Sequence, residues 1–413
     1  MRIVSGPEAA AMIERLAARG ADFAAIEPRV RRIVNDVRRG GDRALRRYAE
    51  QWDGLAPRQS LRVSKKEMAE AWKSLRPQLR TALRQAAENI RRFCEWQKPR
   101  SWKRSYNGSS LGQIVQPLGS VGCYAPGGRY PLVSTVLMTV IPAQVAGVKN
   151  IRVVSPKPSQ EVFAAAEMLG VEEFYRVGGA QAVAALAYGT ESIPQVDKIV
   201  GPGNAYVTAA KKIVSFDCAI DFLAGPTEAL IVGDIGNPEF IAADLVAQAE
   251  HDVQALALFI TTSRKLARAV ADFVPRLAEG NHTAQQSLRK RGVILVAPSR
   301  KKALDWANQL APEHITIAQP DLPFVHNAGS IFLGDYSAQA AGDYASGPNH
   351  VLPTSAQARF RGGLSVLDFV KIITVQQFSP AGLKKIASTI ECLAGAEGLP
   401  AHANSIRVRC ARA

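Results

Sequence analysis

The sequence predicts an α/β fold with two parallel sheets, a helical N-terminal region and a small C-terminal tail. From about residue 114 onward, short runs rich in valine and isoleucine alternate with helical segments. Several of these runs end in a glycine turn that opens a helix, which is the pattern of successive strand–helix–strand units. At 413 residues the chain is too long for one ordinary core. We therefore expect two Rossmann-like domains.

The first hundred residues have a helical pattern. A short helix is expected from Glu8, and apolar residues recur three and four positions apart over 26–52 and again over 65–96. The periodicity fails over 100–107, a polar and basic stretch. We expect a helical N-terminal region that ends near residue 99.

The first sheet is expected within residues 114–223. Its strands are predicted at 121–124, 151–154, 173–177 and 198–200. Glycine turns follow three of them, at Ala125–Gly128, Gly178–Gln181 and Gly201–Asn204. Glycine allows backbone amides to approach a phosphate, and the N-terminus of a helix favours negative charge. None of the turns is a G-x-G-x-x-G motif, so a dinucleotide site at these carboxyl strand ends would be non-standard.

A second sheet is expected from residue 229 to residue 333. Its strands are predicted at 229–232, 255–261, 292–296, 315–318 and 330–333, with helices near 238–248, 263–278 and 301–310. The pattern becomes helical again at 365–370 and 380–393, and a strand is expected at 405–408. This tail is too small to fold alone, so we expect it to dock on another surface.

The composition argues against several classes of protein. No run of about 18 apolar residues occurs and the chain begins without a charged-then-apolar leader, so we expect a cytoplasmic protein with no membrane span. The five cysteines are scattered, without a Cys-x-x-Cys pair, which fits a reducing compartment and argues against a thiolate zinc site. We interpret Cys123 as a small apolar core residue rather than a nucleophile, because no histidine lies near it in sequence.

The net charge of +15 raises the question of nucleic-acid binding. Much of this charge lies in the first hundred residues, in stretches such as Arg29–Arg32 and Arg38–Arg39. These arginines recur at helical spacing with Asp36 and Asp42 between them, and no aromatic residues are interleaved. A solvated basic helix face is the better interpretation.

Four of the six histidines lie in segments that also carry Glu, Asp or Gln, namely 248–251, 312–314, 342–350 and 397–402. Imidazole is a common metal ligand and proton carrier near neutral pH, so this clustering indicates one assembled polar site. Gln248 and His251 are three apart on a predicted helix and share a face. Glu313 and His314 can divide proton transfer between a carboxylate and an imidazole.

These segments resemble histidinol dehydrogenase in the right order and over nearly the full length of the chain. The matching motifs are Tyr124–Gly128, Gly201–Asn204, Ala224–Glu228, Gln248–His251, Ala311–His314, Gly342–Thr354 and Glu397–His402. The resemblance implies oxidation of L-histidinol through L-histidinal to L-histidine with two NAD and one zinc ion. Thr227 stands where serine is common in the family, which keeps the hydroxyl and adds a methyl group.

The resemblance also implies roles for individual residues. Glu313 and His314 match the catalytic acid/base pair. The implied zinc ligands are Gln248, His251, Asp343 and His402, with His402 supplied by the partner subunit of a homodimer. The implied substrate-binding residues are Thr227, Gln248, His251, His314, Asp343, His350, Glu397 and His402. The implied NAD contacts are Tyr124, Gln181 and Asn204.

On this basis we expect four parts of the chain. They are a short helical segment at 1–20, a main α/β domain formed by 21–120 and 228–364 that carries the metal and acid/base residues, an NAD-binding α/β domain at 121–227, and a dimerisation tail at 365–413. Three other functions stay open at this point. They are a related zinc- and NAD-dependent dehydrogenase acting on another polar alcohol such as a sulfonated diol, a metal-dependent hydrolase, and a nucleic-acid-binding protein.

Overall fold

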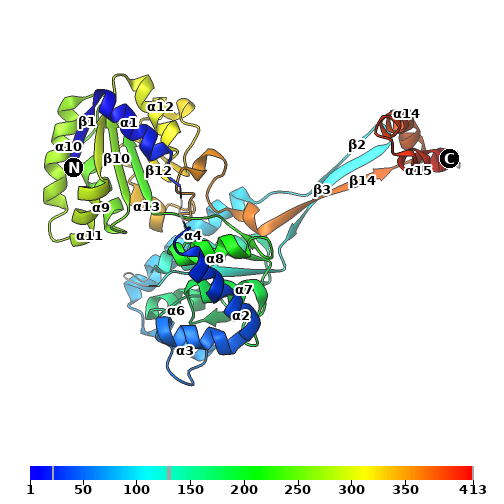
Figure 1. Ribbon diagram of the computed structural model, residues 1–413, viewed down its shortest axis with the longest axis horizontal. Coiled ribbons are helices and arrows are strands. Elements are labelled where there is room, and N and C mark those ends of the chain that lie inside the picture. The colour runs from blue at the N-terminus through cyan, green and yellow to red at the C-terminus, as the bar shows by residue number, and fades with distance from the viewer. Residues whose placement is uncertain (21–22, 128–131, 412–413) are drawn as a thin grey trace.

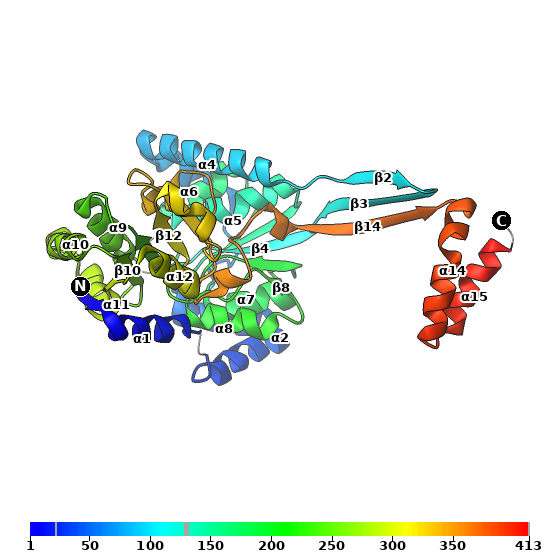
Figure 2. The same cartoon turned by 90° about the horizontal axis from the view of Figure 1, so that it is seen from above.

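A computed structural model describes residues 1–20, 23–127 and 132–411 of the chain. Two α/β domains form the body of the molecule, and a long arm extends from the body to a pair of helices (Figures 1 and 2). Gly128 of the first expected glycine turn lies outside the described residues. None of the described helices is long and apolar enough to cross a membrane.

The first sheet is fully parallel and has the strand order β6-β5-β4-β7-β8. Its strands are β4 (Ser120–Tyr124), β5 (Asn150–Val154), β6 (Glu173–Tyr175), β7 (Lys198–Val200) and β8 (Ala219–Ile220). Its helices are α5 (Val133–Ala146), α6 (Gln160–Met168), α7 (Gly179–Tyr188) and α8 (Ala205–Val214). The predicted strands of this sheet are confirmed. The direction of winding changes between β4 and β7, which is where open parallel sheets usually bind ligands.

The long N-terminal helices pack on the helices that cover this first sheet. They are α2 (Glu27–Tyr48), the π-helical turn η1 (Ala49–Asp53), α3 (Lys65–Ser74) and α4 (Pro77–Gln97). Helix α2 contacts α7 and α8, α3 contacts α6, and α4 contacts α5. The expected grouping of 21–120 with 228–364 is therefore wrong for these helices. The small alanine side chains of α7 allow α2 to bury its apolar face, including Val30 and Leu45, against them.

The second sheet is also parallel and has the strand order β1-β11-β10-β9-β12-β13. Its strands are β1 (Arg2–Ser5), β9 (Glu228–Val232), β10 (Leu256–Thr261), β11 (Val293–Val296), β12 (His314–Ile317) and β13 (Ser330–Leu333). Around it lie α1 (Gly6–Ala17), α9 (Pro238–Glu250), α10 (Arg264–Leu277), α11 (His282–Arg291), α12 (Arg300–Leu310), η2 (Gln319–Phe324), α13 (Gln339–Tyr344) and η3 (Gln357–Arg359). The sequence reasoning missed β1 and α11. Because β1 pairs with β11, residues 1–20 belong to this sheet rather than to a separate helical segment.

The arm is an antiparallel sheet that ends in two helices. It consists of β2 (Trp102–Tyr106), β3 (Ser109–Pro117), β14 (Val370–Phe378), α14 (Pro380–Ala396) and α15 (Pro400–Cys410). The turn η4 (Val366–Phe369), which leads into β14, packs against α4 and α5 in the body. In Figure 1, α14 and α15 lie at the far end of the arm and pack against each other. Two expectations are wrong here. Most of 365–370 forms a 3₁₀ turn, and 405–408 are helical because α15 continues through them. The sequence reasoning also missed the strand at 102–106.

Candidate active site at the junction of the two sheets

The acid/base pair lies at the amino edge of the second sheet. Glu313 immediately precedes β12, and His314 is the first residue of that strand. Strand β12 pairs with β9, and Thr227 immediately precedes β9. Neighbouring strand starts therefore bring Thr227, Glu313 and His314 together. This edge is opposite to the one where ligands of parallel sheets usually bind.

A chain of hydrogen bonds ends on one carboxylate oxygen of Glu313. Gln248 Nε2 donates to Thr227 Oγ1 at 2.8 Å, and Thr227 Oγ1 donates to Glu313 Oε2 at 2.5 Å. The backbone N–H of Glu228 donates to the same Oε2 at 2.8 Å. The threonine hydroxyl thus links a predicted metal ligand to the predicted base. Because Gln248 donates through its nitrogen, its amide oxygen is the atom left to bind a cation.

The environment of Glu313 raises its pKa. The residue is 6% exposed, and this burial raises the pKa well above its ordinary value. The charges of Glu228 and Asp343 act in the same direction, while the hydrogen bonds from Thr227 and Glu228 oppose it. A carboxyl group shifted toward neutral pH is suited to take a proton from water and return it.

Arg19 pairs with Glu228 beside this base. Arg19 Nε lies 2.7 Å from Glu228 Oε1, and Arg19 Nη2 lies 2.5 Å from Oε2. Glu228 Oε1 also accepts the backbone N–H of Ser355 at 2.9 Å. The sequence reasoning missed this pair, and no local signal marks it, because the two residues are 209 positions apart.

His314 is a buried imidazole between two carboxylates. Its Nδ1 lies 3.9 Å from Glu313 Oε2, and its Nε2 lies 3.8 Å from Asp343 Oδ1. Burial lowers the pKa of His314, and the charge of Asp343 opposes that shift. Within the described part of the chain, Nδ1 has no hydrogen-bond partner. A neutral imidazole in this position can accept a proton from a substrate hydroxyl.

Three of the four predicted zinc ligands lie together. His251 follows α9 directly, and its Nε2 lies 3.7 Å from Oδ2 of Asp343 on α13. Gln248 lies one turn earlier on α9. Imidazole, carboxylate and amide oxygen are ligands that suit zinc, and they are one short of a four-ligand site. The described residues of one chain contain no group of three His, Cys, Asp or Glu side chains arranged to hold a metal ion.

Glu397 and His402 do not join this cluster. Glu397 follows α14 and His402 lies on α15, so both are at the far end of the arm, where they are exposed. His350 does lie at the junction. Its Nδ1 is 2.8 Å from the backbone oxygen of Asp343, and its Nε2 is 3.5 Å from Oγ1 of Thr135 near the start of α5. Because α5 follows β4, His350 connects the amino edge of the second sheet with the carboxyl edge of the first.

The predicted NAD contacts lie at the carboxyl edge of the first sheet. Tyr124 ends β4, Gln181 is in the first turn of α7, and Asn204 caps α8 by accepting the backbone N–H groups of Tyr206 and Val207. Asn204 is exposed, whereas Tyr124 and Gln181 are 3% and 1% exposed. Tyr124 and Gln181 therefore form the floor of this edge.

A buried ion pair, which the sequence reasoning missed, holds the turn that leads to Asn204. Lys211 Nζ donates to Asp221 Oδ1 and to the backbone oxygen of Gly201, both at 2.6 Å. Asp221 Oδ2 accepts the Gly201 N–H at 2.7 Å. Gly201 has a φ of +111°, and a Cβ there would lie 2.2 Å from the backbone oxygen of Tyr124. The close packing of this turn therefore requires glycine.

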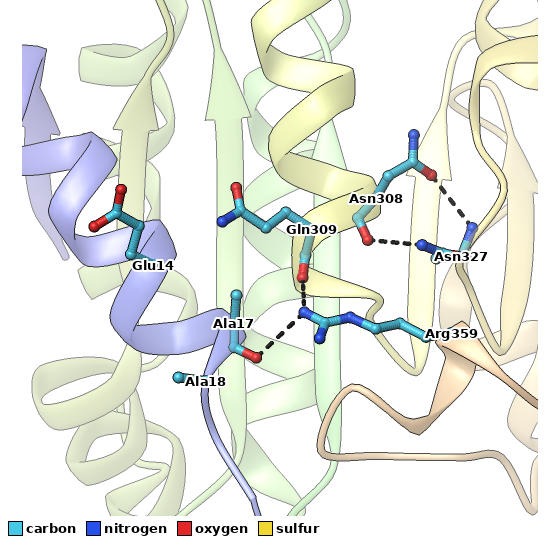
Figure 3. Close-up of a pocket in the computed structure, with 7 residues that line it drawn as sticks. All are labelled: Glu14, Ala17, Ala18, Asn308, Gln309, Asn327 and Arg359. Atoms are coloured by element: carbon cyan, nitrogen blue, oxygen red, sulfur yellow. Dashed lines mark hydrogen bonds between the residues drawn. The ribbon is translucent and has the colours of Figure 1, made fainter.

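Two cavities lie away from these residues. A shallow groove of about 590 Å³ separates α1 from α12 and the 357–359 turn (Figure 3). Arg359 there donates to the backbone oxygens of Ala17 and Gln309, and Asn308 and Asn327 bond each other, so the groove is a structural contact. The second cavity, of about 510 Å³, lies at the carboxyl edge of the second sheet and is lined by Asp244 and Arg300 among others.

The comparisons with known proteins agree on one family. Residues 16–410 match the sequence profile described as Histidinol dehydrogenase. The chain is 48% identical over 392 residues to the histidinol dehydrogenase of Methanothermobacter thermautotrophicus, a match covering 91% of this chain and 92% of that protein. It is 45% identical over 393 residues to that of Aquifex aeolicus, covering 93% and 92%. The crystal structure of histidinol dehydrogenase from Elizabethkingia anophelis matches with a TM-score of 0.93 at 36% identity, covering 99% of this chain and 98% of that one.

Proposed function

Because the chain belongs to the histidinol dehydrogenase family and is therefore an oxidoreductase, we propose that it oxidises L-histidinol to L-histidine through L-histidinal. The reaction consumes two NAD and one water and releases two NADH. The observation that carries this proposal is the cluster of Thr227, Glu313 and His314 beside Gln248, His251 and Asp343.

In the first oxidation, His314 takes the proton of the substrate hydroxyl. The alcohol carbon loses a hydride at the same time, and NAD is the group that accepts one hydride in each oxidation. Burial favours the neutral form of His314, which is the form able to accept this proton. Asp343, whose Oδ1 lies 3.8 Å from Nε2, then stabilises the protonated ring.

In the second oxidation, Glu313 draws a proton from water as the water oxygen bonds to the aldehyde carbon, and His314 gives the proton it took in the first oxidation to the aldehyde oxygen. The resulting hydrate loses its carbon-bound hydrogen as a hydride and a hydroxyl proton, and it becomes the carboxylic acid. His314 again receives the hydroxyl proton. Thr227 and the Glu228 N–H hold Oε2 of Glu313, so Oε1 is the oxygen that faces the water.

In this proposal Gln248, His251 and Asp343 hold the zinc ion together with His402 of the partner subunit. When bound, zinc anchors the imidazole and amine of the substrate and so keeps the reactive aldehyde in place between the two oxidations. The three donors found at the junction, an imidazole, a carboxylate and an amide oxygen, fit this role, and the imidazole of His402 from the partner subunit would make four ligands.

The extended arm supports a homodimer with shared sites. Glu397 and His402 lie at its end, and exposed apolar side chains line it, including Ile372, Ile373 and Leu393. An exposed apolar surface of this kind is typical of an obligate interface. We propose that each arm crosses to a second copy and completes the site there.

His402→Ala tests the shared site. We expect the zinc content measured by metal analysis to fall to near zero and the activity with it. When His402→Ala and Glu313→Gln chains are refolded together, hybrid dimers regain one intact site, for about a quarter of wild-type activity from random pairing. One zinc ion per chain in His402→Ala, or no recovery on mixing, would contradict the proposed exchange of arms.

The function itself is tested by counting NADH. Purified protein with L-histidinol and excess NAD should yield about two NADH per substrate, as expected for oxidation to the acid. About one NADH per substrate would indicate a simple alcohol dehydrogenase. Absence of turnover by protein with full zinc content would favour a related dehydrogenase acting on another polar alcohol, and failure to bind NAD would favour a hydrolase.

A further inference from the structure

Asp53 is a buried carboxylate under the carboxyl edge of the first sheet. It ends the π-helical turn η1, far from the predicted site in sequence, and it is 8% exposed. Its Oδ2 accepts the backbone N–H of Gly178 at 2.9 Å and the side-chain Nε2 of Gln181 at 3.0 Å. Both donors belong to the turn that opens α7.

The bond from Asp53 determines which way the Gln181 amide points. A carboxylate only accepts hydrogen bonds, so the NH₂ group of Gln181 must face Asp53 and the amide oxygen must face away. Rotating the amide by half a turn would place two oxygens against each other. Asp53 therefore sets the direction of the Gln181 amide.

In this orientation the amide oxygen of Gln181 is buried and has no hydrogen-bond partner among the described residues. Gln181 is 1% exposed, and its Oε1 has no hydrogen-bond partner in the described part of the chain. The amide lies directly over Gly179, where a Cβ would be 2.6 Å from Oε1. The hydroxyl of Tyr124 accepts the Gly179 N–H at 2.9 Å and holds that glycine in place. A buried acceptor without a partner is costly, and a ligand that donates to it removes the cost.

We propose that Asp53 is a positioning residue of the cofactor site, which orients Gln181 so that its Oε1 accepts a hydrogen bond from the bound dinucleotide. The inference rests on the proposed function, in which this edge binds NAD. The donor is a ribose hydroxyl, the NH₂ of the nicotinamide carboxamide or the amino group of the adenine, since these are the O–H and N–H donors of the dinucleotide and a phosphate is not one. Sequence reasoning assigns Gln181 to this edge and leaves out the residue that orients it.

The experiment measures NAD affinity by equilibrium titration of the purified, zinc-loaded protein. Asp53→Ala frees the Gln181 amide to rotate, and we expect the Kd for NAD to rise about tenfold. The KM for NAD should rise similarly, while kcat at saturating NAD stays within about twofold. Asp53→Asn restores near wild-type affinity, because its amide oxygen can take the place of Oδ2 and accept both bonds.

A double-mutant cycle separates orientation of Gln181 from simple support of the turn. Gln181→Met removes the amide and should weaken NAD binding by about the same factor as Asp53→Ala. Adding Asp53→Ala to Gln181→Met should cause no further loss. Additive losses would overturn the proposal, since Asp53 would then act without Gln181. The proposal can be tested even if Asp53→Ala does not fold. An unchanged NAD affinity in Gln181→Met alone would overturn it.

Asp321→Ala provides a matched control. Asp321 is also a buried carboxylate, but it pairs with Arg300 in the second domain, so its removal should leave the Kd for NAD within about twofold. An equal rise in Kd for Asp321→Ala and Asp53→Ala would show a global effect and would overturn the proposal. If the wild-type protein itself does not bind NAD, the proposed function fails first, and this outcome is distinct from an unchanged Kd in Asp53→Ala.

The 3-acetylpyridine analogue of NAD, which has no carboxamide NH₂, shows whether the carboxamide is the donor. If the carboxamide donates to Gln181, Asp53→Ala weakens NAD and leaves the affinity for the analogue unchanged. If a ribose hydroxyl or the adenine amino group donates, Asp53→Ala weakens both by the same factor. Either result supports the role of Asp53.

Discussion

The two parallel sheets present opposite edges to the junction between them. In the first sheet the residues of interest lie at or after the ends of the strands, since Tyr124 is the last residue of β4 and Asn204 comes after β7. In the second sheet they precede the strands, as Thr227 precedes β9 and Glu313 precedes β12. The rule that ligands bind at carboxyl strand ends therefore locates half of this site and not the other half.

The difference between the edges corresponds to a difference in chemistry. The first edge offers glycine turns, helix N-termini and an unpaired amide oxygen, which are suited to a dinucleotide. The second edge offers buried titratable groups whose pKa values are shifted by burial, which are suited to proton transfer. If this division is right, changes at the first edge alter cofactor affinity and changes at the second alter the chemical steps.

Glu313→Gln should give the largest effect. Without the base, oxidation of L-histidinal to L-histidine is expected to fall about 1000-fold, while oxidation of L-histidinol to L-histidinal is partly retained and the Kd for NAD is unchanged. Stopped-flow measurement of NADH with each substrate separates the two steps. Equal loss of both steps would contradict the separate roles of Glu313 and His314.

Thr227→Val should give the next largest effect. The valine has nearly the same shape but lacks the hydroxyl that joins Gln248 to Glu313, so we expect kcat for the aldehyde step to fall about 30-fold. Thr227→Ser is the control, because it keeps the hydroxyl and should stay within about threefold of wild type. A wild-type rate in Thr227→Val would show that the hydrogen bond has no role in the chemistry.

Asn204→Ser tests the other edge with a smaller effect. Serine also caps helices, so the thermal stability should change little, but the exposed NH₂ of Asn204 is lost. We expect the Kd for NAD to rise about fivefold with kcat unchanged at saturating NAD. A fall in kcat with unchanged NAD affinity would contradict the assignment of cofactor binding to the first edge and of the chemical steps to the second.

The pH profile of the aldehyde step should have an acid limb that belongs to Glu313. Burial raises the pKa of Glu313, so its proton-accepting form is lost as pH falls through a value above the ordinary 4.5. Below that pKa the rate of aldehyde oxidation should fall about tenfold per pH unit, and this limb should be absent in Glu313→Gln. An acid limb that persists in the variant would assign it to another group.

The sequence predicted the elements of both sheets well, because buried parallel strands appear as continuous apolar runs bounded by glycine turns. The sequence did not predict features that depend on contacts with segments distant in the chain. Strand β1 has four residues and exists through its pairing with β11, and the grouping of the N-terminal helices depends on the alanines of α7. In the arm, the alternation of Ile406 and Val408 predicts a strand, but these residues lie in α15.

The candidate site was predictable only in part. Histidine and carboxylate motifs identified Gln248, His251, Glu313, His314 and Asp343, which the structure brings together. Arg19, Asp53 and Lys211 carry no motif, because their roles depend on contacts that only the folded chain creates.

A crystal structure of the protein with NAD and L-histidinol bound would show which edge of which sheet holds the cofactor. The division of the two edges predicts the dinucleotide along the carboxyl edge of the first sheet, near Asn204, with its nicotinamide directed toward His314. A dinucleotide bound instead in the cavity beside Asp244 and Arg300, at the carboxyl edge of the second sheet, would contradict it.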